Sequence, residues 1–304
     1  MRANGNVNIF GASLGTMAKK KRPTPELPEP LIPLFDAHTH LGHTVPKDAL
    51  EEGLEEAVGK LVDRAVRAGV RGICTIGEGL TDTELAVRIA HINERVWAAC
   101  AIHPTKADTL DSEARERLVA LAQDTRCVAI GETGLDRYWL ERDPETPSLE
   151  VQEEALRWHI DLACAVGKPL MIHNREADED LLRILDDAPE PTAVILHCFS
   201  SPLDVAKECL DRGYVLSFAG NVTFKPNDHL RAAAAYAPSD MLLVETDAPF
   251  MTPMPFRGAK NEPGFVGYTA RAIAQERGED PAFFAAQVTA NAERLYGVSV
   301  TDGD

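Results

Sequence analysis

Short apolar runs rich in β-branched residues recur along the chain, and longer stretches with a helical pattern separate them. Runs of this length and composition are typical of strands that are buried on both faces of a sheet. The pattern predicts eight strands, which cover residues 31–36, 72–76, 96–102, 127–130, 169–173, 193–197, 214–218 and 241–245.

The stretches between these runs carry apolar residues at helical spacing. In 150–166 the apolar positions follow steps of four, three, four and three residues, which mark one face of a helix: Val151, Ala155, Trp158, Leu162 and Ala165. Similar stripes predict further helices in 48–68, 82–94, 111–123, 177–187, 202–211, 228–237, 266–277 and 281–295.

Strands that alternate with helices predict an α/β protein with a parallel sheet. Eight such units predict a single (β/α)8 TIM barrel over residues 31–298 of the 304-residue chain. A doubly wound open sheet is the alternative. It is disfavoured because no glycine-rich phosphate loop follows the first predicted strand.

The two ends of the chain lie outside this repeating pattern. Residues 1–30 combine a basic cluster at 19–22 with closely spaced prolines, which predicts a flexible tail, and Met17 is an alternative start. Residues 299–304 form a short C-terminal tail. The chain has no secretory signal, no membrane-length apolar run and no CxxC pair among its six cysteines, which predicts a cytoplasmic protein with reduced thiols.

The sequence Asp-Ala-His-Thr-His at 36–40 stands at the end of the first apolar run. Side chains alternate between the two faces of a strand, so His38 and His40 are expected on one face. Two imidazoles on one face at a strand end can bind one metal ion, although an isolated pair of this kind is also common on protein surfaces.

Other residues of the metal-binding type follow four more of the predicted strands. In a barrel enzyme the active site lies at the carboxyl ends of the strands, so these residues are expected to meet the histidine pair. The six predicted metal ligands are His38, His40, Glu132, His173, His197 and Asp247. Each of them alone has a structural explanation, and only their joint placement favours a metal site.

Six ligands exceed the number that a single tetrahedral zinc ion takes. Two divalent ions bridged by a carboxylate and a hydroxide would use all six. Such a pair suits the hydrolysis of phosphate esters. The mixture of imidazole and carboxylate fits zinc, manganese or nickel better than calcium, and it is compatible with magnesium.

The net charge of the chain is −17, which repels nucleic acid at long range. A substrate that carries phosphate must therefore be attracted by metal ions or by nearby cationic side chains. The predicted substrate-binding residues lie after barrel strands: His103, Arg137, Arg175, Lys225 and Arg257. Tyr138, Trp139 and Phe224 are candidates for stacking on bases, with packing as the alternative role.

Several motifs, in this order, resemble the TatD family of metal-dependent hydrolases, a branch of the amidohydrolase-like barrels. The resemblance covers residues 35–297, nearly the whole predicted barrel, and it implies a barrel of the metallo-dependent hydrolase type. Its motifs are Asp-Ala-His-Thr-His-Leu (36–41), Ile-His-Pro (102–104), Gly-Glu-Thr-Gly-Leu-Asp (131–136), Ile-His-Asn-Arg (172–175), His-Cys-Phe-Ser (197–200), Asn-Val-Thr-Phe-Lys (221–225), Glu-Thr-Asp-Ala-Pro (245–249) and Arg-Gly-Ala-Lys-Asn-Glu-Pro (257–263).

The resemblance implies a role for each ligand. The two histidines of the motif at 36–41 would bind one ion together with Asp247, and His173 and His197 would hold the second. Glu132 would bridge the two ions, and Asp247 would be the general base. Thr133, Arg137 and Ser201 depart from the usual family pattern without touching an expected ligand.

Members of the family resemble deoxyribonucleases that degrade DNA, often from the 3′ end, with magnesium or another divalent ion. The resemblance therefore implies a hydrolase acting on ester bonds, with single-stranded DNA or a 3′ end as substrate. A hydrolase of another ester, a lactone or an amide is the alternative, and a metal-stabilised barrel without activity is a third. No obligate protein partner is evident, and a monomer is expected.

Overall fold

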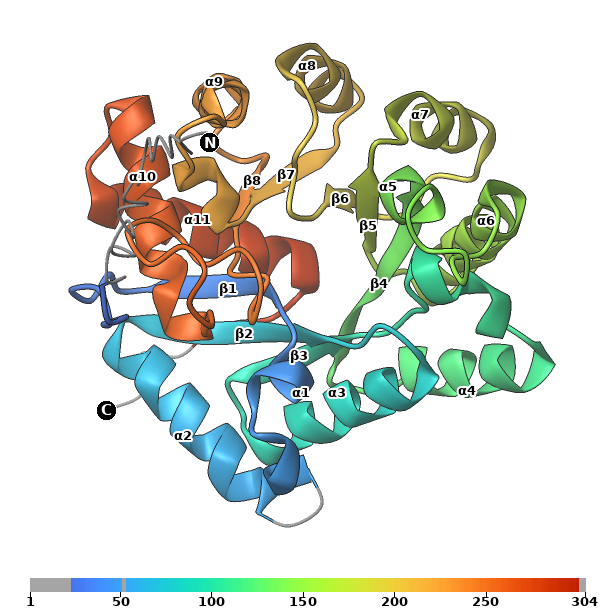
Figure 1. Cartoon of the computed structure of the whole chain (residues 1–304), viewed down its shortest axis with the longest axis horizontal. Helices are drawn as coiled ribbons and strands as arrows, with labels where there is room; N and C mark the ends of the chain where they lie inside the picture. Colours follow the sequence, from blue (N-terminus) through green and yellow to red (C-terminus); the bar gives the residue numbers. More distant parts are fainter. Residues whose placement is uncertain (1–22, 51–52, 301–304) are drawn as a thin grey trace, which may run out of the picture.

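The computed structural model describes residues 23–50 and 53–300. Within these residues the chain forms eight strands that pair in parallel, in their sequence order (Figure 1). The strands are β1 (Leu34–Thr39), β2 (Val70–Ile76), β3 (Val96–Ala99), β4 (Cys127–Asp136), β5 (Leu170–Arg175), β6 (Val194–Leu196), β7 (Val215–Phe218) and β8 (Leu242–Val244).

Helices surround the strands on the outside (Figure 1). They are α1 (Leu41–Thr44), α2 (Leu54–Arg67), α3 (Leu80–Ile92), α4 (Ser112–Ala122), α5 (Arg137–Leu140), α6 (Leu149–Val166), α7 (Asp178–Asp187), α8 (Leu203–Asp211), α9 (Asp228–Tyr236), α10 (Val266–Arg277) and α11 (Pro281–Tyr296), with 3-10 turns η1 (Lys47–Leu50), η2 (Pro104–Thr109), η3 (Gly220–Thr223) and η4 (Pro263–Phe265).

The first strand and the segment after the last strand lie next to each other. The backbone N–H of Asp247 donates to the carbonyl of His38 at 2.9 Å, and that of His40 donates to the carbonyl of Ala248 at 2.8 Å. These bonds link the two edges of the sheet at its carboxyl end. The result is a nearly closed (β/α)8 barrel, so the predicted TIM barrel is confirmed and the open sheet is wrong.

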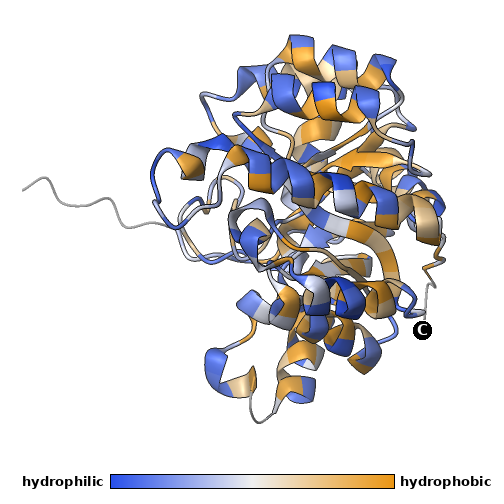
Figure 2. Ribbon diagram, turned by 90° about the vertical axis from the view of Figure 1, so that its right-hand side faces the viewer, coloured by the Kyte–Doolittle hydropathy of each residue, from blue (hydrophilic) through white to orange (hydrophobic). Residues whose placement is uncertain are grey.

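Apolar side chains fill two layers. One cluster lies between strands and helices, and a second fills the inside of the barrel. In the inner cluster the rings of Phe35 and Trp97 stack at 5.7 Å, and Tyr296 of α11 packs against Phe35. The strands are therefore the most apolar part of the chain, while the helices carry hydrophilic residues outward (Figure 2).

The predicted elements agree with the observed ones except at their ends. The carboxyl ends of β1, β4 and β5 extend three, six and two residues beyond their predicted limits of 36, 130 and 173. His38 and Glu132 therefore belong to strands, as His173 was predicted to, and neighbouring strands hold the backbone at all three. The four-residue helices α1 and α5 were not predicted, because so short a segment has no measurable periodicity.

Part of the predicted N-terminal tail packs on the barrel. Tyr268 and Arg271 of α10 donate hydrogen bonds to the carbonyls of Glu26 and Glu29 at 3.1 and 2.6 Å. At the other end, the N–H of Val300 donates to Glu293 at 2.7 Å. The rest of the two predicted tails, residues 1–22 with Met17 and residues 301–304, lies outside the described residues.

None of the helices in the described part of the chain is both long and apolar enough to cross a membrane.

Candidate metal centre

The six predicted ligands meet at the carboxyl end of the barrel, around an open pocket of about 630 Å³. His38 and His173 lie on β1 and β5, and Glu132 lies on β4. His40, His197 and Asp247 follow β1, β6 and β8 and line the pocket wall.

His38, His40 and Asp247 form one half of this centre, called here the β1–β8 half. The Nε2 atoms of His38 and His40 are 3.3 Å apart, and each faces Asp247 Oδ1, at 3.8 and 3.4 Å. Glu132 completes the group, with its oxygens 4.0 Å from His38 Nε2 and 3.4 Å from His40 Nε2.

These separations can be compared with the geometry of a bound ion. Nitrogen and oxygen ligands about 2.0–2.1 Å from a zinc-sized ion stand about 3.3–3.4 Å apart at tetrahedral angles. The shorter separations in the β1–β8 half, 3.3 to 3.4 Å, match this value. The residues present therefore fit a divalent ion.

His173 and His197 form the other half, the β5–β6 half, and share Glu132 with the first. His173 Nδ1 and His197 Nε2 are 3.4 Å apart. Glu132 Oε2 lies 3.6 Å from the former and 2.7 Å from the latter. Three donor atoms on three different strands or strand ends thus converge, and Glu132 is the carboxylate of the six that lies within 4.0 Å of histidine nitrogens in both halves.

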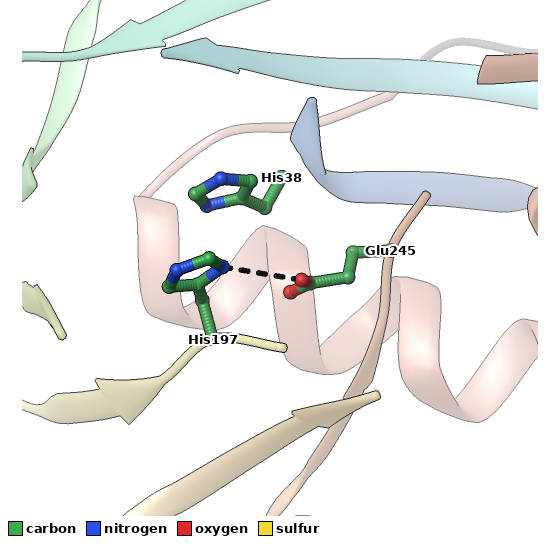
Figure 3. A group of neighbouring side chains, drawn as sticks. All are labelled: His38, His197 and Glu245. Carbon is green, nitrogen blue, oxygen red and sulfur yellow. Dashed lines mark hydrogen bonds and ion pairs between the residues drawn. The ribbon is translucent and has the colours of Figure 1, made fainter. Parts of the chain in front are cut away.

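Carboxylates lie behind both histidines of the β5–β6 half. Asp136 Oδ2 is 3.0 Å from His173 Nε2, and Glu245 Oε1 is 3.3 Å from His197 Nδ1 (Figure 3). The outer nitrogen of each ring donates its hydrogen to the carboxylate, so the inner nitrogen keeps its lone pair for a metal. Glu245 also accepts from the N–H of Cys198 at 2.8 Å and from the Ser217 hydroxyl.

The histidines of the β1–β8 half have no such carboxylate. His38 Nδ1 lies 3.0 Å from the sulfur of Met171, a weak acceptor. His40 Nδ1 is buried and has no hydrogen-bond partner among the described residues. The His38 ring instead stacks on the His197 ring, with centroids 3.8 Å apart (Figure 3).

Asp247 is held in place from the first strand. The carboxylate of Asp36 accepts from the N–H and the hydroxyl of Thr246 at 2.7 and 2.6 Å. Both side chains are buried, and the pair adds to the backbone bonds between β1 and the segment after β8. The first residue of the Asp-Ala-His-Thr-His motif therefore positions Asp247 from the opposite end of the sequence.

The electrostatics of the centre favour positive charge. Burial lowers the pKa of His40, but the hydrogen bond with Asp247 and the charges of Glu132 and Asp247 outweigh it and raise the pKa to about 9. Burial also lowers the pKa of His197, but the negative charge of Glu132 outweighs it. The pKa of His197 is therefore raised well above its usual value. A metal cation competes with protons for such nitrogens.

Two other groups of the centre have their pKa shifted. Burial, then the charge of His197, holds the pKa of His38 well below its usual value, so this ring stays neutral as a metal ligand must. Burial raises the pKa of Glu132, but the charge of His197 and the hydrogen bonds with His173 and His197 outweigh it and leave the pKa well below normal. Glu132 is therefore an ionised carboxylate.

Two glycines allow β4 to run close to β5. A Cβ on Gly131 would come within 2.4 Å of Met171 Cβ, and one on Gly134, at φ +148°, would come within 1.9 Å of the carbonyl oxygen of His173. Only glycine fits at these close approaches. The Gly-Glu-Thr-Gly sequence thereby brings Glu132 next to His173 of the neighbouring strand.

The predicted substrate-binding residues are found at different distances from the pocket. His103 and Arg175 line it. His103 is buried, its ring packs edge-on against His173 at 4.4 Å, and its Nδ1 is 2.7 Å from the Thr105 hydroxyl. Burial, then the charge of His173, lowers the pKa of His103 to about 3.

The other three predicted cations do not line the pocket. Arg137 forms an ion pair with Asp180 at 2.5 Å. The guanidinium of Arg257 lies 4.3 Å from the ring centroid of Phe224. Lys225, which follows Phe224 in the sequence, is exposed. The structure therefore separates Arg175 from the other cations that followed barrel strands.

Sequence reasoning gave no role to Asp36 and Asp136. Both stand inside motifs that contain a ligand, but nothing in their spacing indicates which nitrogen or backbone group they contact. Asp136 follows Glu132 by four residues, so the two side chains lie on the same face of the strand. This spacing was the available signal that Asp136 lies near the metal centre. The structure also places the carboxylate of Glu245 3.3 Å from His197 Nδ1.

A barrel in which six imidazole and carboxylate side chains converge at the carboxyl ends of the strands has the arrangement expected of a metal-dependent hydrolase. Residues 35–297 match the family described as TatD related DNase, and the chain belongs to this family. It is 46% identical over 265 residues to an uncharacterised metal-dependent hydrolase TatD of Mycobacterium tuberculosis, with 87% of this chain and 98% of that protein covered.

Other similar proteins agree with this assignment. The chain is 35% identical to a protein of Cronobacter sakazakii named 3′-5′ ssDNA/RNA exonuclease TatD, covering 78% of this chain and 90% of that one. Among solved structures, the TatD homologue YjjV of Escherichia coli K12 superposes with a TM-score of 0.77 at 25% identity, covering 88% of this chain and 98% of that chain.

Proposed function

We propose that this protein is a deoxyribonuclease that hydrolyses the phosphodiester bonds of single-stranded DNA, from a 3′ end, with two divalent ions. The sharing of Glu132 between the two halves of the metal centre is the observation that carries the proposal. Two ligand groups with a common carboxylate suit a pair of ions a few ångströms apart, the arrangement of many phosphodiester hydrolases. The relatives named as exonucleases support the same substrate class.

The chain's residues would divide between the two ions as the family resemblance implies. His38, His40 and Asp247 would hold one, and His173 and His197 the other, with Glu132 bridging them. Zinc, magnesium, manganese and nickel are all compatible with this set. When bound, such ions lower the pKa of a water molecule and neutralise charge on phosphate oxygens.

The remaining chemistry falls to the protein's own side chains. Asp247 and Glu132 both line the pocket, and the Asp247 side chain is the more accessible of the two, 10% exposed against 3%. Asp247 is therefore the carboxylate that can accept the proton of the water that attacks phosphorus. Attack forms one P–O bond and breaks another, and the leaving oxygen takes a proton.

Substrate binding is assigned first to the pocket wall. Arg175 would bind phosphate, and His103, neutral and 9% exposed, would donate or accept a hydrogen bond. Arg137, Lys225 and Arg257 would contact parts of a longer strand outside the pocket. The six free cysteines fit a reducing compartment, so we expect the protein to act in the cytoplasm. We expect it to act as a monomer.

The experiment is hydrolysis of 3′-labelled and 5′-labelled single-stranded DNA by protein loaded with Mg²⁺, Mn²⁺ or Zn²⁺. The wild type should release labelled nucleotide first from the 3′ end, and His173→Ala should not. His229→Ala, which changes an exposed histidine on α9, is the matched control. If the wild type releases no labelled nucleotide with any of the three metals, the proposed nuclease function is rejected.

A panel of carboxylic ester, lactone and amide substrates belongs to the same experiment. The wild type could turn over one of these substrates and leave DNA intact, with the turnover lost in His173→Ala. That result would identify the protein as another metal-dependent hydrolase instead of a deoxyribonuclease.

A further inference from the structure

Arg175 stands out from the other cations near the metal centre. Among the described residues that line the pocket it is the only arginine or lysine. Its guanidinium makes no hydrogen bond or ion pair with a described residue, whereas Arg137 nearby is paired with Asp180. In a chain of net charge −17, an unpaired arginine at the pocket wall is a natural contact for phosphate.

Aromatic rings hold Arg175 by its face. Its Cζ lies 3.6 Å from the ring centroid of Tyr138 and 6.0 Å from that of Trp139. Arg142 stacks on the same tyrosine, with Cζ at 3.8 Å. A guanidinium stacked by its face keeps its N–H edges free for the two oxygens of a phosphate.

Trp139 offers a second surface beside the arginine. It lines the pocket and is 42% exposed, although a tryptophan buries most of its surface in an ordinary core. Base stacking on an exposed aromatic ring contributes about 1–3 kcal/mol per base. Arg175 and Trp139 thus present the two groups that a nucleotide needs, one for its phosphate and one for its base.

These groups are fixed relative to the metal centre. One oxygen of Asp136 accepts from the N–H of Trp139 at 2.7 Å, at the start of α5, while the other pairs with His173 at 3.0 Å. Arg175 follows His173 by two residues on β5, so the two side chains share a face about 6.6 Å apart. The arginine therefore reaches beyond a phosphate held at the metal centre, toward the next one.

We propose that Arg175, Tyr138 and Trp139 form a subsite for the nucleotide next to the scissile phosphate. The inference rests on the proposed nuclease function and names how its substrate is recognised. Arg175 binds the neighbouring phosphate, Trp139 stacks on the base, and Tyr138 holds the arginine. Because stacking needs an unpaired base, the subsite selects single strands and gives the enzyme a preference for substrates longer than one phosphodiester.

The first test compares two arginines on the same ring. Arg175→Gln and Arg142→Gln each remove one positive charge and one contact with Tyr138, but Arg142 does not line the pocket. For each metal-loaded variant, kcat/KM is measured on trithymidylate and on thymidine 5′-(4-nitrophenyl phosphate). Arg175→Gln should lose about tenfold to a hundredfold more on the trinucleotide than on the smaller diester, and Arg142→Gln less than about threefold.

The second test measures binding without hydrolysis. Fluorescence anisotropy of a labelled, phosphorothioate-linked oligothymidylate gives Kd for the wild type, Arg175→Gln, Trp139→Leu and Arg142→Gln. We expect the first two variants to bind about tenfold or more weakly and Arg142→Gln like the wild type. Binding that depends on Arg175 and Trp139 without hydrolysis of DNA would support the subsite and reject the nuclease.

Two results would overturn the subsite. One is that the wild type hydrolyses both substrates and that Arg175→Gln lowers kcat/KM equally on both, or on neither. The other is an oligothymidylate affinity that is absent in the wild type or unchanged in both Arg175→Gln and Trp139→Leu.

Discussion

The β1–β8 half and the β5–β6 half of the metal centre contain two histidines each, but these histidines are held in different ways. In the β5–β6 half a carboxylate lies behind each ring, at 3.0 Å for His173 and 3.3 Å for His197. In the β1–β8 half the outer nitrogen of His38 meets a methionine sulfur, and that of His40 meets no described hydrogen-bond partner.

The difference indicates two ways of orienting a ligand. Carboxylate-backed histidines have a fixed tautomer and a more basic inner nitrogen, so they bind a metal more tightly. The histidines of the β1–β8 half depend on burial and on the backbone bonds between β1 and the segment after β8. We therefore expect the two halves to respond differently to substitution.

Glu132 belongs to both halves, so its substitution should have the largest effect. Glu132→Gln keeps the shape of the side chain but removes the charge that faces all four histidines. We expect kcat to fall on the order of a thousandfold and metal content to fall in both halves. Mass spectrometry of bound metal and steady-state kinetics measure these, with the exposed α4 residue Glu116→Gln as control.

Retention of one full ion by Glu132→Gln would mean that the halves do not share this carboxylate equally.

His159 extends the comparison to a buried histidine that is backed by carbonyl and hydroxyl oxygens. Burial lowers the pKa of the ring to about 4. The hydrogen bond that its Nδ1 donates to the carbonyl of Ala155 raises the pKa, but less strongly. Since the unfolded ring takes up a proton near pH 6.5, stability is full above that pH and falls toward pH 4. The loss is about 3 kcal/mol.

Urea unfolding between pH 4 and 7 measures this loss. His159→Gln should flatten the dependence of the unfolding free energy on pH, and His229→Gln, which changes an exposed histidine on α9, is the control. Equal slopes in the wild type and His159→Gln would show that this ring is not held neutral.

Asp136→Asn should affect the β5–β6 half alone. The amide keeps the size of the side chain but removes the negative charge behind His173. We expect the affinity of the second ion to fall about 10–100-fold, with the first ion unchanged. Calorimetric titration with Mn²⁺ resolves the two steps.

Asp124→Asn is the matched control for this change, because Asp124 pairs with His91 at the same 3.0 Å on the outside of the barrel. If Asp136→Asn weakened both ions equally, the separation into two halves would be wrong.

Met171→Leu should have the smallest effect. A thioether is a weak acceptor, and leucine fills a similar volume in the inner core. We expect less than about a threefold change in metal affinity and in kcat. A tenfold loss would indicate that the sulfur orients His38 as effectively as a carboxylate, and the contrast between the halves would disappear.

Most of the architecture followed from local patterns in the sequence. The eight strands and the nine longer helices of the described residues were predicted within a few residues at most ends, because apolar runs and helical apolar stripes reflect burial directly. The six candidate ligands were also predicted, since the carboxyl ends of parallel strands meet at one face of a barrel. Their roles as metal ligands remain a prediction.

The supporting contacts could not be read in the same way. Asp36 and Thr246 are 210 positions apart, and neither lies in a pattern that indicates the other. The order of importance among the cations was also hidden: Arg137 and Arg175 both follow strands, but only the pairing with Asp180 and the stack on Tyr138 distinguish them.

The sequence by itself determined that this chain is a parallel barrel with histidines and carboxylates at the carboxyl ends of its strands. The tertiary structure alone decided which nitrogen of each histidine faces inward, which carboxylates stand behind the β5–β6 half, and which arginine is left unpaired in the pocket. The physical reason is that periodicity records the burial of each residue, whereas a hydrogen bond depends on positions that distant segments reach only when the barrel closes.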